Sequence, residues 1–448
     1  MSRIAILTGA TGGLGQAFAA ELLKENLDEI LDEWNQGLCI GSRIMYKIDT
    51  ERADLFDVNM MIAMQITVAG QATEPELTQA FRDAVEAFEI LNCKIVIDGE
   101  GRAFYDSGDG SRNSLSFRHF ELESLIHEQE CVRFRLEEGE FLRCFVSLAD
   151  GDQMKMCFMM HHLGGDGKSL CYFIEAFLRR LSGKTCEYRR AVFLNSETLP
   201  RDSKIPFLAS ALVNHYNRKW RKERRVFDFE DMRAAHETFW KTHRTTVRNE
   251  VTPSDALQEK LHQCKANGIG FTSYTIAEML QSVPQEQDVG LAVDGRQDGN
   301  RTMSNQATGI SVKYRYDQEK TLLQNAAEIH RRMKNKLRSN RYRYFILRFM
   351  GEFDPTLVDA VNLEFAGYFH SKTSAKLARL LGYGQKSKDL SITNLTRLDI
   401  PVEYGHYTLT DLIFVPPVIS YGKNIVGMVT VDGHLNTTYH HYQDAKPE

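Results

Sequence analysis

The chain has 448 residues, of which 42% are hydrophobic and 26% are charged, and its formal net charge is −5. These values are typical of a globular protein with large buried cores, and they exclude a disordered chain, a collagen and a coiled coil. The nearly balanced charge provides no global attraction to nucleic acid or to an anionic membrane, so neither partner is expected.

The chain begins with a short β-branched strand at residues 3–8, followed by a glycine-rich loop and a helix. The loop reads T-G-A-T-G-G-L-G and resembles the cofactor loop of short-chain dehydrogenases, in which backbone N–H groups hold a pyrophosphate at a helix N-terminus. Gly9, Gly13 and Gly15 are therefore the candidate cofactor-binding residues. The second strand and the other dehydrogenase motifs do not follow, so we interpret residues 1–38 as a truncated Rossmann-like β-α segment.

A new unit begins near Cys39, and its hydrophobic periodicity predicts one helix and a run of strands. We expect the helix at residues 75–89 and the strands at residues 60–68, 131–136, 141–148 and 153–161. An amphipathic helix follows, with apolar side chains at Leu170, Phe173, Ile174, Phe177, Leu178 and Leu181. The polar, irregular segment 182–206 then predicts a crossover to a second half of the chain.

The second half repeats the mixture of helices and strands. We expect a charged helical region at residues 207–245, strands at 289–293 and 310–316, a helix at 318–338 and a C-terminal hairpin around Asp432-Gly433. Because helices and strands interleave in both halves, the sequence predicts an α/β architecture with mixed sheets. We place the two lobes at residues 39–200 and 201–448.

The eight cysteines are scattered without a C-x-x-C pair, which favours reduced thiols in a cytoplasmic protein and no metal site. No apolar run approaches the ~20 residues that a membrane-spanning helix needs. Two basic stretches, at 217–225 and 331–343, are interpreted as solvated helix faces rather than nucleic-acid contacts.

The heptapeptide H-H-L-G-G-D-G at residues 161–167 is the most informative pattern in the chain. It places an imidazole where a strand ends and a glycine-rich turn begins, so the ring can project into a cleft. A histidine at neutral pH can take a proton from a hydroxyl or an amine and return it to a leaving group. Glycines in the turn permit tight or positive-φ backbone, and Asp166 can anchor it through a salt bridge.

The pattern HHxxxDG resembles the signature of CoA- and carrier-dependent acyltransferases with the chloramphenicol acetyltransferase-like fold. These include condensation domains, polyketide-associated acyltransferases, alcohol acyltransferases and plant acyltransferases. The resemblance covers about residues 39–448. It implies two α/β lobes with mixed sheets and a central channel, preceded here by the short β-α segment.

The resemblance also implies roles for individual residues. His162 is the general base, His161 supports it, and Asp166 and Gly167 complete the catalytic motif. Arg296 is the expected salt-bridge partner of Asp166. Two further residues, in the segments MSNQATG and SITNLTR, are expected to line the channel, namely Asn305 and Asn394.

The same resemblance implies an acyl-CoA or phosphopantetheinyl thioester as co-substrate, with no tightly bound cofactor. The acceptor is a small alcohol or amine, and the enzyme is expected to be an O-acyltransferase. The D-F-G-W type motif of condensation domains has no good match, the nearest segments being SYGKN at 420–424 and the following NIVGM. This departure favours a standalone acyltransferase over a peptide-forming condensation domain.

Three other functions remain open at this point. The first is an amide-forming condensation-type enzyme, and the second is a catalytically silent module that binds carrier proteins. The third is an NAD(P)-dependent short-chain dehydrogenase, against which the incomplete N-terminal segment counts.

Overall fold

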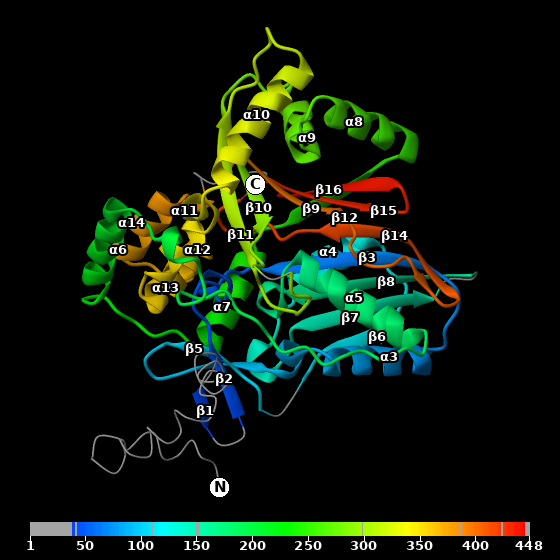
Figure 1. The fold of residues 1–448 in the computed structure, drawn as a ribbon. Helices are drawn as coiled ribbons and strands as arrows, with labels where there is room; N and C mark the ends of the chain where they lie inside the picture. Colours follow the sequence, from blue (N-terminus) through cyan, green and yellow to red (C-terminus); the bar gives the residue numbers. More distant parts are fainter. Residues whose placement is uncertain are drawn as a thin grey trace, which may run out of the picture.

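The computed structural model describes residues 38–40, 43–108, 111–148, 152–297, 299–384, 388–422 and 424–443. In this part of the chain, strands form two six-stranded sheets and one four-stranded sheet (Figure 1). Nearly all of the segment 1–38, including Gly9, Gly13 and Gly15, lies outside the described residues.

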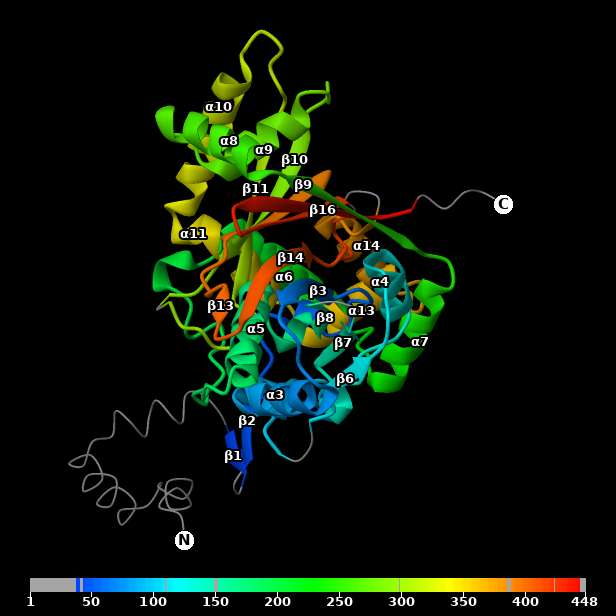
Figure 2. The same cartoon turned by 90° about the vertical axis from the view of Figure 1, so that its right-hand side faces the viewer.

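The first sheet has the strand order β13-β14-β3-β8-β7-β6. Their bounds are Glu403–Tyr404, Tyr407–Val415, Met61–Ala69, Gln153–His161, Leu142–Leu148 and Ser114–Phe117. Helices α3 (Glu74–Glu86) and α5 (Gly167–Leu181) pack together against this sheet (Figure 2). Phe173 on α5 makes edge-to-face ring contacts with Phe81 on α3 and Phe158 on β8, so one aromatic core holds the two helices to the strands.

The second sheet has the strand order β11-β10-β12-β15-β16-β9. Their bounds are Ala307–Tyr314, Gln287–Asp294, Leu390–Arg397, Asn424–Val431, His434–Tyr442 and Thr245–Thr252. Helices α8 (Ser254–Ala266), α9 (Phe271–Leu280) and α10 (Leu322–Leu337) cover this sheet on the side away from the first sheet (Figure 1). Their apolar side chains share a separate core with β10, β11 and β15, which includes Leu280, Val289, Val312, Ile329 and Met428.

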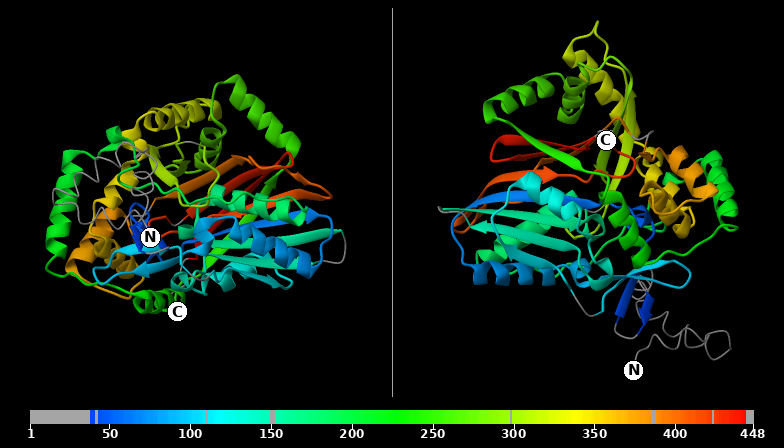
Figure 3. Two further views of the ribbon diagram at one scale, coloured as in Figure 1. Left: turned by 60° about the horizontal axis from the view of Figure 1, so that its bottom comes forward. Right: turned by 180° about the vertical axis from the view of Figure 1, so that it is seen from behind.

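The remaining elements lie at one end of both sheets (Figure 3). The four-stranded sheet comprises β1 (Leu38–Ile40), β2 (Arg43–Lys47), β5 (Ala103–Asp106) and β4 (Lys94–Ile97). Six helices of the second half form a cluster beside it, α6 (Phe207–Trp220), α7 (Phe229–Trp240), α11 (Asn340–Arg343), α12 (Phe345–Gly351), α13 (Pro355–Phe365) and α14 (Lys372–Leu381). Helix α4 (Leu122–Glu130) lies between the strands β6 and β7 in sequence. Among the described residues, no helix is both long and apolar enough to cross a bilayer.

Strand β14 joins the two halves of the chain. It belongs to the second half in sequence, yet it pairs antiparallel with β3 from Ala63↔Val415 to Ala69↔Thr408 and extends the first sheet. In the first sheet, the strands of the segment 403–415 therefore come from beyond the predicted boundary at residue 200, whereas the other strands come from before it.

Most of the predicted elements are present, and one is wrong. The strands expected at 60–68, 141–148 and 153–161 are β3, β7 and β8, and the amphipathic helix is α5. The strand expected at 131–136 is absent, because this segment turns after α4 and enters a 3-10 helix at Leu136–Glu138. The guanidinium of Arg143 donates hydrogen bonds to the carbonyl oxygens of Val132 and Arg133, which a strand would use for ladder bonds.

Candidate active site

The histidine pair lies where β8 ends. His161 is the last residue of β8, and His162 opens a 3-10 turn that extends to Gly164. The backbone N–H of His162 donates to Met60 O at 2.8 Å, and the N–H of His161 donates to Phe141 O at 2.9 Å, so both neighbouring strands hold the pair. His161 is buried, whereas His162 remains partly exposed.

His161 supports the turn as a neutral ring. Its Nδ1 accepts a hydrogen bond from the N–H of Leu163 at 3.1 Å, which requires that Nδ1 carries no proton. Burial, followed by the positive charges of His162, Arg143 and Arg133, lowers the pKa of His161 to about 3. The ring therefore stays uncharged at neutral pH and fixes the backbone immediately after His162.

The two ring nitrogens of His162 have different surroundings. Its Nδ1 is buried and has no hydrogen-bond partner in the described residues, while the side chain as a whole is partly exposed. Nε2 is therefore the ring nitrogen that remains accessible. An imidazole at the end of a strand, with its backbone hydrogen-bonded on both sides, is suited to act as a general base.

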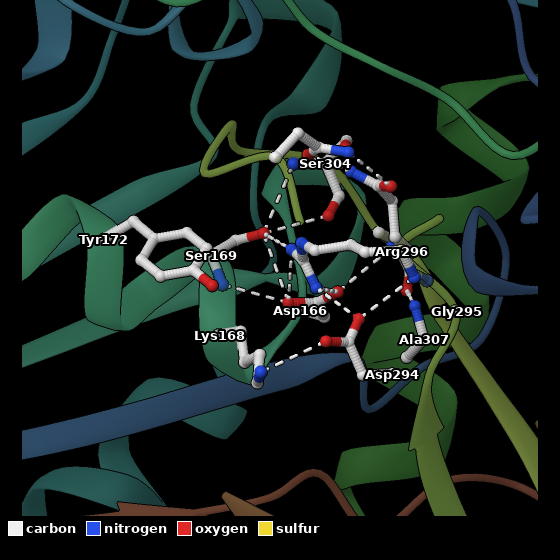
Figure 4. Close-up of polar contacts among 12 residues, drawn as sticks. Asp166, Lys168, Ser169, Tyr172, Asp294, Gly295, Arg296, Ser304 and Ala307 are labelled. Carbon is white, nitrogen blue, oxygen red and sulfur yellow. Dashed lines mark hydrogen bonds and ion pairs between the residues drawn. The ribbon is translucent and has the colours of Figure 1, made fainter. Parts of the chain in front are cut away.

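Asp166 anchors the turn through a dense set of hydrogen bonds (Figure 4). Its carboxylate caps the N-terminus of α5 by accepting from Ser169 N at 2.9 Å. The same carboxylate forms a bidentate ion pair with Arg296, with distances of 2.9 and 3.0 Å, and accepts from Gln306 N at 3.0 Å. Arg296 also contacts Asp294 at 3.1 Å. The predicted pairing of Asp166 with Arg296 is present, and it joins α5 to the loop after β10.

Two glycines of the motif are required by close packing. Gly165 has φ +148°, and a Cβ there would lie 2.5 Å from Ser169 Cβ. Gly167 begins α5 beneath two residues of the second half, where a Cβ would lie 3.0 Å from Leu395 Cδ2 and 3.2 Å from Phe414 Cζ. A side chain at Gly165 would therefore clash with Ser169, whereas a side chain at Gly167 would require Leu395 and Phe414 to shift slightly.

Sequence reasoning missed residues 51–60, which we call the acidic segment. Arg52 in this segment pairs with Asp359 on α13, Nε to Oδ1 at 2.8 Å, and both side chains are buried. Asp57 accepts from Ser420 Oγ at 2.6 Å, so the segment contacts the second lobe at two points. The signal available in the sequence is a group of three carboxylates and one arginine directly before a buried strand.

The acidic segment is also connected to the motif turn, once through Tyr105 and once directly. Tyr105 Oη lies 2.8 Å from Glu51 Oε1 and 2.9 Å from Leu163 O, so it bridges the start of the segment to the turn. At the end of the segment, Met60 O accepts from His162 N. The acidic segment therefore lines one side of the histidine turn.

The two predicted channel residues occupy different surroundings. Asn305 Nδ2 donates to Asp54 Oδ2 at 2.7 Å, which places Asn305 against the acidic segment. Asn394 Nδ2 donates to Thr272 Oγ1 at 3.0 Å, and its Oδ1 accepts from Thr396 N at 2.7 Å, so it belongs to the second sheet. The structure thus brings Asn305 to the motif, while a channel role for Asn394 stays a prediction. Among the described residues, no three His, Cys, Asp or Glu side chains are grouped to hold a metal ion.

No family model matches the chain, and no curated protein sequence matches it. Solved structures do match over most of the chain at low identity. A trichothecene 15-O-acetyltransferase from Fusarium sporotrichioides is 11% identical, with 91% of this chain and 92% of that chain covered and a TM-score of 0.60. The first condensation domain of the CDA synthetase is 14% identical, with 88% and 87% covered and a TM-score of 0.55.

The starter condensation domain of rhizomide synthetase, solved in complex with C8-CoA, is 13% identical. It covers 89% of this chain and 89% of its own, with a TM-score of 0.54. At these identities the likeness shows the fold, which is the two-lobed fold of condensation and acyltransferase domains. The predicted two-lobed α/β fold with mixed sheets is therefore confirmed, whereas the central channel stays a prediction and the β-α segment lies almost entirely outside the described residues.

Proposed function

We propose that this chain is a cytoplasmic acyltransferase that moves an acyl group from an acyl-CoA or carrier-protein thioester to an acceptor hydroxyl. The placement of His162 carries the proposal. Its ring lies at the end of β8 in a turn held by His161 and Asp166, with Nδ1 buried and Nε2 free for a substrate. The fold is shared with an O-acetyltransferase and with a domain solved with an acyl-CoA, which supports both parts of the proposed reaction.

The proposed reaction needs one base and no covalent acyl-enzyme. Nε2 of His162 takes the proton of the acceptor hydroxyl, and the oxygen attacks the thioester carbonyl carbon. The tetrahedral intermediate then collapses as the C–S bond breaks, and the proton on His162 passes to the departing thiolate. A positioned base of this kind contributes about 10²- to 10⁴-fold to the rate.

The ion pair of Asp166 with Arg296 has a positioning role in this proposal. It lies between α5 and the loop after β10, so it fixes the histidine turn relative to the second lobe. Two substrates that enter between the lobes meet a base whose backbone is fixed by both, which is the geometric requirement for catalysis by proximity.

The test is release of free thiol from acyl-CoAs in the presence of a panel of alcohols and amines. We expect turnover with an alcohol, and His162→Ala to lower kcat at least about 100-fold while the far-UV circular dichroism and Tm stay close to those of the parent. His119→Ala is the matched control, because this side chain is 81% exposed and its contacts, with Glu121 at 3.5 Å and Ser147 at 3.4 Å, are long. Full turnover by His162→Ala would overturn the proposal.

The same panel separates the other candidate functions. Turnover with amines alone indicates an amide-forming enzyme. Binding of acylated carrier protein without thiol release, in the parent and the variant alike, indicates a silent carrier-binding module. A dehydrogenase would instead bind NAD(P)H, which a fluorescence titration detects.

A further inference from the structure

Asp54 is held beside the motif turn by contacts from both lobes. It lies within the acidic segment, between Glu51, which Tyr105 bridges to the turn, and Met60, whose carbonyl oxygen accepts from the N–H of His162. Its Oδ2 accepts from Asn305 Nδ2 at 2.7 Å, and Asn305 is itself oriented because its Oδ1 accepts from Ala307 N at 3.1 Å. The next residue, Gln306, donates its N–H to Asp166 at 3.0 Å. Asp54 is therefore fixed relative to the motif through both its backbone and its side chain.

The carboxyl group of Asp54 responds to the charge of His162. Burial raises the pKa of Asp54 to about 6, and the positive charge of His162 is the strongest influence that lowers it, ahead of the hydrogen bond from Asn305. The other titratable groups near this pair are Glu51, Asp57, Tyr105, His161, Tyr383 and Tyr421.

These neighbours leave Asp54 as the carboxylate best placed to act on His162. Burial raises the pKa of Glu51 well above its ordinary value, so this carboxyl favours its neutral form. Asp57 is engaged by both the N–H and the hydroxyl of Ser420. His161 is neutral, and burial keeps the three tyrosine phenols protonated.

We propose that Asp54 is a positioning residue for His162, whose carboxylate stabilises the imidazolium that forms when His162 takes the acceptor proton. This inference rests on the proposed role of His162 as general base. It also assigns Asn305 a role, which is to hold the Asp54 carboxylate in place.

In the proposed step, His162 is the only side chain that carries the transferred proton. The acceptor proton moves to Nε2 of His162 and later to the departing thiolate, while Asp54 stays ionised throughout. Because Asp54 is buried, the attraction is less screened than between two exposed charges, and it is strongest when the ring is charged. Asp54 thus favours the state that follows proton transfer over the neutral ring that precedes it.

The first experiment needs no turnover. The ring resonances of His162 are titrated by NMR in the full chain labelled at histidine, with His162→Gln used to assign them. We expect Asp54→Asn to move the titration midpoint of His162 down by at least about 0.5 pH unit, since an adjacent carboxylate favours the charged ring. The Asn side chain can still accept from Asn305, so shape and packing are retained. An unchanged or higher midpoint overturns the proposal.

The second experiment measures thiol release by the same variants. We expect Asp54→Asn to lower kcat at least about 10-fold with KM for the thioester nearly unchanged, and the acid limb of the pH profile to move to lower pH. Asp49→Asn is the matched control, because Asp49 is near in sequence but accepts from the backbone of Ser196. It is expected to leave kcat and the His162 midpoint unchanged.

Asn305→Ala provides a second variant that retains the carboxylate. It is expected to move the His162 midpoint in the same direction by a smaller amount, and an opposite movement contradicts the proposal. A lowered midpoint in Asp54→Asn together with no thiol release by the parent refutes the acyltransferase function alone. Normal kcat and an unchanged midpoint in Asp54→Asn refute the role of Asp54 alone.

Discussion

At the residue scale, the motif turn is held by groups whose protonation is fixed by burial. His161 is neutral because a charged ring would be desolvated and would lie near His162 and two arginines. Asp166 is surrounded by donors, and Arg296 is its buried counter-ion. These two side chains make different and separable contributions to stability.

We predict that His161 makes the protein acid-sensitive. Its pKa is about 3 in the folded state and about 6.5 when unfolded, so the unfolded chain binds the extra proton between these values. The stability from the neutral ring is complete above pH 6.5 and is lost as the pH falls. In His161→Asn, whose Oδ1 can still accept from Leu163 N, urea unfolding from pH 6 to 4 is expected to show a slope smaller by about 1.4 kcal/mol per pH unit.

The control for this change is His119→Asn, in which the slope is expected to equal that of the parent because the ring is exposed. A slope in His161→Asn as steep as that of the parent would show that His161 is charged in the folded protein.

We predict that removing Arg296 alone lowers the free energy of unfolding more than removing the charges of both Arg296 and Asp166. Arg296→Met leaves the buried carboxylate of Asp166 without its counter-ion, and loss of one partner of a buried pair costs roughly 3–5 kcal/mol. Adding Asp166→Asn removes the unpaired charge while retaining acceptor capacity for Ser169 N. Urea unfolding is therefore expected to find the double variant more stable than Arg296→Met, and the reverse order would show that the charge is not buried.

At the element scale, local patterns predicted much of the fold and the motif turn of the candidate site, but not the acidic segment beside it. The structure confirms three features that depend on local sequence patterns. These are the amphipathic helix α5, the strands that precede the motif, and the hairpin around Asp432-Gly433. Asp54 could not be found in this way, because it meets the motif turn only after β3 and β8 pair in the first sheet. Likewise, the segment 131–136 has strand composition, but the Arg143 side chain binds the carbonyl oxygens that a neighbouring strand would need.

The turn between β8 and α5 depends on Gly165. We predict that Gly165→Ala destabilises the protein by roughly 1–3 kcal/mol and lowers kcat, because φ +148° is strained for alanine and its Cβ would meet Ser169 at 2.5 Å. Gly99→Ala is the matched control, since a Cβ there meets nothing within 4 Å. Urea unfolding and thiol release measure both effects, and equal stability of the two variants would show that the turn adapts to a side chain.

At the scale of the whole molecule, the lobes are joined by a strand and by buried polar pairs. Strand β14, which comes from the second half of the chain, is part of the first sheet. In addition, Arg52 of the acidic segment pairs with Asp359 on α13, and Asp57 accepts a hydrogen bond from Ser420. Contacts of this kind couple the two cores, so neither lobe is expected to unfold alone.

We predict that the protein unfolds in a single transition. Arg52→Met is expected to lower the Tm of this transition without splitting it into two. Burial raises the pKa of Asp359 to about 6 even with Arg52 beside it, and without Arg52 the carboxyl takes up a proton at still higher pH. At pH 5 the carboxyl of Asp359 in the variant can therefore be protonated and neutral. At pH 8 the variant must bury an unpaired negative charge, and the loss in free energy of unfolding approaches roughly 3–5 kcal/mol. Differential scanning calorimetry is expected to show one peak in both proteins, with a larger difference in Tm at pH 8 than at pH 5. Two peaks in the variant, or a difference that does not depend on pH, would mean that Arg52 does not link the lobes through a buried charge.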